Sequence, residues 1–80
     1  MDRQVALIVA STIIRTQSEL GDLLPFVKAN CDQEIYKKFL AAMGGVLAEI
    51  GLELLNPIFD LHPELKVEFD ERRSKYGRLF

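Results

Sequence analysis

The residues best suited to chemistry in this sequence are two glutamates and the single histidine. Glu49 and Glu53 are four positions apart, so on a helix their carboxylates would project the same way and could share a proton or hold a metal ion. His62 stands between acidic residues, in Asp60-Leu-His-Pro-Glu64. Helical di-metal sites need Glu-x-x-His pairs on further helices, which one histidine cannot supply. We therefore expect a solvated acidic stripe and a polar turn, and rank a weak metal-binding or enzymatic site third among the possible functions.

Two further groups of residues carry reactive or charged side chains. Cys31 would act as a nucleophile only beside a base placed by the fold, and no local motif supplies one, so an inert thiol is expected. Basic and aromatic residues alternate near the C-terminus, which suits contact with phosphates and bases but also the ordinary stabilisation of a helix end. This segment is a candidate docking tail for a partner, formed by Arg72, Arg73, Lys75, Tyr76 and Arg78.

Length and composition exclude several classes of protein. The chain has 80 residues, is 49% hydrophobic and carries a formal net charge of −2, so we expect one helical domain over residues 1–80 rather than a disordered chain or a dedicated nucleic-acid binder. A domain of this mass buries only about 63% of its surface. One cysteine and one histidine provide neither an internal disulfide nor a standard zinc cluster, so self-association is the expected source of further burial. The sequence has no phosphate-binding glycine loop or nucleophile elbow, and we expect no cofactor.

Two apolar runs raise the question of targeting or membrane insertion. The run Val5–Ile14 resembles the apolar part of a secretory signal, but Arg15 and Glu19 fall where a cleavage region would be uncharged. The run Phe39–Ala48 is followed by two glutamates, whereas a membrane span needs about 20 mainly apolar residues. The sequence therefore predicts neither a signal peptide nor a membrane span, and the unpaired cysteine fits a reducing cytoplasm.

Capping and helix-breaking residues predict an all-α domain of four to five helices with one long central helix. The four expected N-terminal caps are Asp2, Asp22, Asp32 and Asn56. The expected segments are a helix over Arg3–Glu19, a short helix from Asp22 to Asn30, a long helix over Gln33–Leu55 closed by Asn56-Pro57, a turn over Pro57–Leu61, and a last helix from Pro63 that stops at Gly77.

Two of these segments also fit β-strands. Val5–Ile14 is rich in β-branched residues, and Leu65–Asp70 alternates between apolar and polar residues. A helix is favoured for the second because Glu68–Arg72 and Glu71–Lys75 form opposite-charge pairs at a spacing of four. In the first segment, helical spacing places one apolar side at Val5, Val9, Ile13 and Leu20.

The long central helix is predicted to be apolar on two faces. One broad arc holds the large side chains of Tyr36, Phe39, Leu40, Met43, Val46, Leu47, Ile50 and Leu54. A separate flank follows the spacing of two helices packed along their lengths, and it consists of Ala41, Gly44, Ala48, Gly51 and Leu55. Each glycine inside an exposed helix costs about 0.5–1 kcal/mol relative to alanine, so close approach of another backbone is expected to offset this cost.

Three explanations of the small-residue flank remain open at this point. The flank could be the seam of a homodimer, it could pack against another helix of the same chain, or the helix could break at Gly44-Gly45. A homodimer is favoured because so short a chain has few neighbours with which to cover two apolar faces.

The sequence therefore predicts a non-enzymatic protein–protein interaction or regulatory module that acts as a homodimeric helical bundle. The alternative is a small nucleic-acid-associated regulator that uses the basic C-terminal segment. The third reading is the weak metal-binding or enzymatic site around Glu49, Glu53 and His62.

Overall fold

The computed structural model describes the backbone of residues 1–76 and the side chains of residues 1–71. Its elements are α1 (Arg3–Gly21), α2 (Leu23–Asn30), α3 (Gln33–Ile50), the π-helix η1 (Gly51–Leu55), α4 (Asn56–Leu61) and α5 (Pro63–Tyr76). No strand occurs within residues 1–76, so the all-α prediction is confirmed and the strand alternatives for Val5–Ile14 and Leu65–Asp70 are wrong. The expected stop at Gly77 lies outside the described residues.

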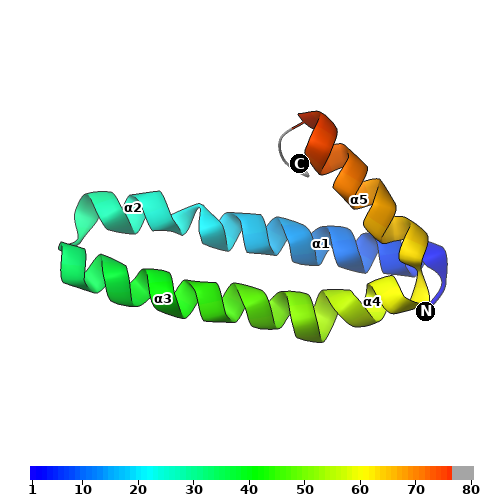
Figure 1. Ribbon diagram of the computed structural model, residues 1–80, viewed down its shortest axis with the longest axis horizontal. Coiled ribbons are helices and arrows are strands. Elements are labelled where there is room, and N and C mark those ends of the chain that lie inside the picture. Colours follow the sequence, from blue (N-terminus) through cyan, green and yellow to red (C-terminus); the bar gives the residue numbers. More distant parts are fainter. Residues whose placement is uncertain (77–80) are drawn as a thin grey trace.

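These elements join into three long helical rods rather than four to five separate helices (Figure 1). The first rod is α1 continued by α2, and the second is α3 continued through η1 into α4. The two rods lie side by side as an antiparallel hairpin, and α5 leaves one end of the hairpin at an angle. A dimeric arrangement of this fold remains a prediction.

The caps explain where the rods begin and why α1 and α2 are nearly continuous. The side chain of Asp2 accepts a hydrogen bond from the backbone N–H of Val5, and that of Asp32 accepts one from Ile35, so both of these caps are confirmed. Asp22 stands directly before α2, as predicted for its cap, but its side chain forms no capping hydrogen bond. Its backbone is helical and donates to the Ser18 carbonyl, so the chain passes from α1 into α2 with little interruption.

The predicted end of the long helix at Asn56-Pro57 is wrong, as is the cap predicted at Asn56. Both residues lie inside the rod, in the first turn of α4. A proline inside an α-helix lacks an N–H donor, and its ring clashes with the carbonyl four residues earlier. The wider π turn of η1 lies directly before Pro57 and changes the hydrogen-bonding pattern where that clash would arise, so the rod continues to Leu61.

The π turn also changes which residues face the other rod. In an uninterrupted α-helix, Leu54 would lie about 20° from the buried Met43 and Leu55 about 120° from it. The structure shows the reverse: Leu54 is 50% exposed, whereas Leu55 is 8% exposed. The predicted arc of large side chains therefore holds only in part: Met43 is buried, Tyr36, Phe39, Leu47 and Ile50 are half-buried, and Leu40, Val46 and Leu54 are exposed.

The core lies at the end of the hairpin where α1, α4 and α5 meet. Its buried residues are Ala6, Ala10, Ile14, Leu55, Ile58, Leu65 and Phe69. The inward stripe of α1 is thus displaced by one residue from the predicted one, since Val5 is exposed and Val9 and Ile13 are only partly buried. Ala6 and Ala10 are fully buried together with Leu65, and their small side chains leave room in this cluster for the larger ones.

The opposite end of the hairpin has little core. No residue of α2 is buried within the described chain, and Phe26 is 66% exposed. The radius of gyration is 14.7 Å, compared with about 11.6 Å for a compact domain of this length. The fold is therefore an elongated hairpin held at one end by α5.

We predict that Leu65→Ala lowers the free energy of unfolding by about 2–5 kcal/mol, because it removes a fully buried side chain and leaves a cavity beneath α5. The matched control is Val67→Ala, which truncates an exposed side chain on the same helix and should change stability by less than about 0.5 kcal/mol. Urea denaturation followed by circular dichroism measures both. Equal effects of the two substitutions would contradict the placement of α5.

Candidate interaction surface

The outward side of α3 carries a row of small residues that is exposed along its whole length. We call Ala41, Gly44, Gly45 and Ala48 the outer face of α3. Helical spacing places them between about 100° and 160° around the helix from the buried Met43. All four are exposed, and no described atom lies within 4 Å of a Cβ built on either glycine, apart from the helix's own local backbone. The outer face therefore has no packing partner among the described residues of the protomer.

This geometry bears directly on the three explanations of the small-residue flank. The break predicted as one alternative at Gly44-Gly45 does not occur, because α3 runs unbroken from Gln33 to Ile50. The other two residues of the predicted flank face inward: Leu55, rotated by the π turn, is buried in the core, and Gly51, at the start of that turn, is half-buried near the Gln17 side chain. Packing within the protomer therefore accounts for Gly51 and Leu55 and leaves the outer face open.

Large apolar side chains are also exposed on the same rod, and those of α3 lie on both flanks of the helix rather than on the outer face itself. Those exposed on α3 and η1 are Ile35, Leu40, Val46, Leu52 and Leu54. Single exposed apolar residues are normal on proteins, but five on one rod beside a row of small residues are typical of a surface that contacts another molecule.

The residues that suggested catalytic chemistry do not assemble into a site. Glu49 lies on α3, Glu53 on η1, and His62 on the turn between α4 and α5. Within the described residues, no group of three or more His, Cys, Asp or Glu side chains is placed to hold a metal ion. Cys31 is exposed at the turn between α2 and α3. The side chains of the predicted docking tail, from Arg72 to Arg78, lie outside the described residues.

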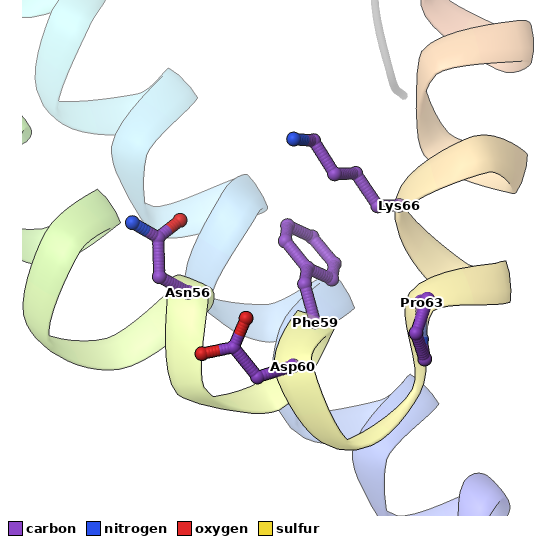
Figure 2. A pocket seen from close by; sticks show the side chains of 5 residues that line it. All are labelled: Asn56, Phe59, Asp60, Pro63 and Lys66. Atoms are coloured by element: carbon purple, nitrogen blue, oxygen red, sulfur yellow. The ribbon is translucent and has the colours of Figure 1, made fainter.

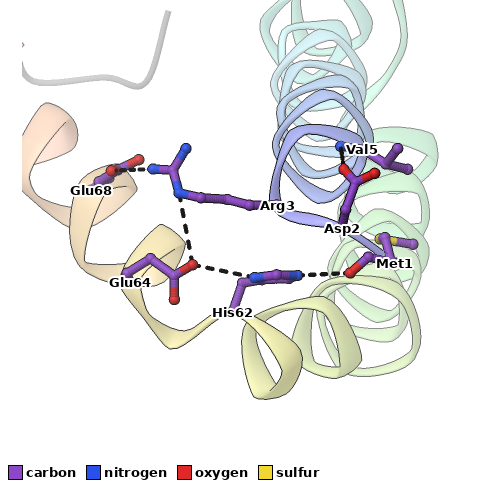
Figure 3. A network of polar contacts seen from close by, with 7 residues as sticks. All are labelled: Met1, Asp2, Arg3, Val5, His62, Glu64 and Glu68. Carbon is purple, nitrogen blue, oxygen red and sulfur yellow. Dashed lines mark hydrogen bonds and ion pairs between the residues drawn. The ribbon is translucent and has the colours of Figure 1, made fainter.

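His62 instead belongs to a polar network that joins the start of the chain to α5 (Figure 3). Its Nε2 lies 2.9 Å from the carbonyl oxygen of Met1, and its Nδ1 lies 3.2 Å from Oε1 of Glu64. Arg3 continues the network with 3.8 Å to Glu64 and a 2.6 Å hydrogen bond to Glu68. Both oxygens facing the ring only accept hydrogen bonds, so both contacts are hydrogen bonds when the ring is a protonated imidazolium.

The position of Glu64 at the first turn of α5 affects its ionisation. A backbone hydrogen bond at Glu64 is the largest cause that lowers the pKa of its carboxyl below the usual 4.5, and His62 and Arg3 add to this effect while desolvation opposes it. The network is exposed, so we assign it the role of orienting α5 rather than a catalytic one.

A solvent-open hollow of about 450 Å³ lies where α4 meets α5 (Figure 2). It is lined by Asn56, Phe59, Asp60, Pro63 and Lys66. Phe59 also packs against Phe69, with 6.1 Å between ring centroids, so its ring serves the core as well as the hollow. The hollow thus results from the angle at which α5 leaves the hairpin.

Comparison with known proteins finds no matching protein family, no similar curated protein and no similar solved structure. Function must therefore be inferred from the geometry of the chain itself.

The second rod is a longer continuous helix than the sequence patterns predicted. The helix over Gln33–Leu61 has 29 residues and is long and apolar enough to cross a membrane, by length and composition alone. The helix predicted from the sequence is shorter, because it ends at Asn56-Pro57.

We predict that the stability of the fold falls with acidification partly because of Glu64. A carboxyl whose pKa is lower in the folded state contributes stability above its unfolded pKa, and this contribution is lost as the pH falls through the folded pKa. Glu64→Gln should therefore reduce the difference in melting temperature between pH 7 and pH 3. Asp70→Asn is the control, since Asp70 is exposed on the same helix and forms no ion pair with another described side chain. A Glu64→Gln protein with the full acid sensitivity of the wild type would contradict the assignment.

Proposed function

We propose that this protein is a non-enzymatic interaction module that works as a homodimer through the outer face of α3. The observation that supports this most directly is the exposure of four small residues on an unbroken helix with no described neighbour. In an isolated protomer, Gly44 and Gly45 would each cost about 0.5–1 kcal/mol relative to alanine with nothing to offset it. A second helix can approach such a surface closely, at the short end of the usual 8–10 Å between helix axes, and the added dispersion contacts offset that cost.

The amount of exposed surface supports the same proposal. The protomer exposes 5821 Å², about 900 Å² more than a compact monomer of this mass. Each partner in a standard protein–protein interface buries about 800 Å². The surplus is therefore comparable to what one such interface would cover.

The ends of the hairpin are the parts that such a dimer would offer to another protein. The tip at α2 exposes Leu23 and Phe26, and α5 projects from the opposite end. Exposed aromatic side chains are common anchors at protein interfaces. We therefore propose that the dimer acts as a regulatory or bridging module whose further partner is a protein.

We predict that Ala48→Leu raises the dimer dissociation constant by one to several orders of magnitude. The added atoms would lie where the two backbones are closest, overpacking costs about 1–3 kcal/mol per strained site, and the twofold axis places the change in the interface twice. Light scattering across a hundredfold dilution of wild type and variant measures the shift.

The matched control is Ala29→Leu, which makes the same change at an exposed alanine on α2 and should leave the dissociation constant unchanged. If the outer face of α3 has no partner, Ala48→Leu will also have no effect, since no described residue of the protomer packs there. A wild type that stays monomeric at every concentration would overturn the proposed function.

A second candidate function, association with a membrane, is supported by the length and apolar character of the Gln33–Leu61 helix. The pairs Ala41/Gly45 and Gly44/Ala48 have the small-xxx-small spacing that is common where membrane helices pack. Flotation with phosphatidylcholine vesicles tests this candidate. Recovery of the protein with the vesicles would favour it, and recovery in the soluble fraction, with a dimeric mass, would favour the soluble homodimer.

A further inference from the structure

Charged residues flank the outer face of α3 in an order that distinguishes one orientation of a second copy from the other. Lys38 precedes the outer face and Glu49 follows it. They are eleven residues apart, which places them within about 20° of each other around the helix. Along the axis the small residues of the outer face lie between them, and both charges are displaced in the same rotational sense, about 80° around the helix from the centre of that face.

Neither charge is paired with another side chain that the structure describes. Lys38 and Glu49 are both exposed. Both side chains are therefore free to contact a molecule that lies along the outer face.

We infer that the second copy docks on the outer face in the antiparallel orientation, with the twofold axis close to Gly44-Gly45 and Lys38 beside Glu49 of the partner subunit. This inference rests on the proposed homodimer and specifies its geometry. In a twofold contact the same surface serves both copies, so each pair of residues occurs twice. A centre between Gly44 and Gly45 places Ala41 opposite the partner's Ala48, so small residues meet small residues throughout.

The register agrees with the reach of the charged side chains. With the same centre, Lys38 lies two residues, about 3 Å along the axis, from the partner's Glu49. A lysine side chain easily covers this offset. Lys38 and Glu49 are both displaced in the same rotational sense from the line along which the two helices touch. In an antiparallel pair such residues from the two copies lie on the same side of the interface, so Lys38 and the partner's Glu49 face each other.

The parallel orientation forms no such pair. Lys38 would then lie level with the partner's Lys38 but on the opposite side of the interface, and about 16 Å along the axis from the partner's Glu49. Charge complementarity across an interface suppresses wrong arrangements more strongly than it adds affinity. The charge pattern therefore specifies orientation, while the small residues allow the close contact.

Cross-linking distinguishes the two orientations, and Cys31 serves as a natural probe. It lies at the start of α3, about 20 Å along the axis from the proposed centre, so two Cys31 residues are about 40 Å apart in the antiparallel dimer and adjacent in a parallel one. A short bis-maleimide should leave wild-type Cys31 uncrosslinked. In a Cys31→Ser background, a mixture of Lys38→Cys and Glu49→Cys proteins should form the mixed cross-linked dimer, and neither variant alone should do so efficiently.

Charge reversal provides an independent test in the uncrosslinked protein. Lys38→Glu alone and Glu49→Lys alone each place like charges together twice in the antiparallel homodimer, so each should raise the dissociation constant about 5- to 30-fold. The double variant Lys38→Glu/Glu49→Lys should restore dimerisation to near the wild-type level. Glu19→Lys, which reverses an exposed charge on α1, is the control for a general effect of net charge.

The possible outcomes separate this inference from the proposed function. Cross-linking of wild-type Cys31, with no effect of Lys38→Glu, would show a parallel dimer and overturn the antiparallel orientation. A dimeric mass without any of these cross-links would place the contact on another face and overturn the inference as well. A monomeric mass at all concentrations would overturn the proposed function itself.

Discussion

The rest of this structure depends on a limit to how much two helices can bury against each other. In a hairpin, each helix covers one stripe of its neighbour and leaves the remaining surface to other elements. Here α5 supplies a third layer, but only at the end where Leu65 and Phe69 pack onto Ala6, Ala10 and Ile58. The long middle of α3 receives no such cover from the described residues. An open apolar surface on α3 is thus a direct result of where α5 lies, and α5 is oriented there by Arg3, His62 and Glu64.

The π turn of η1 determines which residues of the second rod face the core and which stay exposed. It allows the second rod to pass Pro57 without a break, and it rotates the residues that follow so that Leu55 and Ile58 face the core. The same rotation turns Leu55, the last member of the predicted small-residue flank, inward. The contact surface proposed for a second copy is consequently confined to the outer face of α3, between Ala41 and Ala48, where the helix is regular.

Local signals in the sequence predicted the helices well and their junctions less well. The caps at Asp2 and Asp32 and the start of α5 at Pro63 follow from short-range chemistry, and the structure confirms them. The continuation through Asn56-Pro57 could not be read from the sequence, because it depends on a π turn that local propensities do not predict. The inward stripe of α1 was also misplaced, since Val5 and Val9 are more apolar than Ala6 and Ala10, whereas the core includes the smaller pair. The Lys38–Glu49 pattern was present in the sequence, but its meaning required knowing that both side chains are exposed beside an open face.

The central claim is that the outer face of α3 is covered by the same face of a second copy. Isotope-filtered nuclear magnetic resonance on an equimolar mixture of labelled and unlabelled protein tests it most directly, because it detects only contacts between copies. The account predicts intermolecular nuclear Overhauser effects between the methyl groups of Ala41 and Ala48. Intermolecular effects confined to other surfaces, such as Leu23 and Phe26 at the α2 tip, or none at all at millimolar concentration, would contradict it.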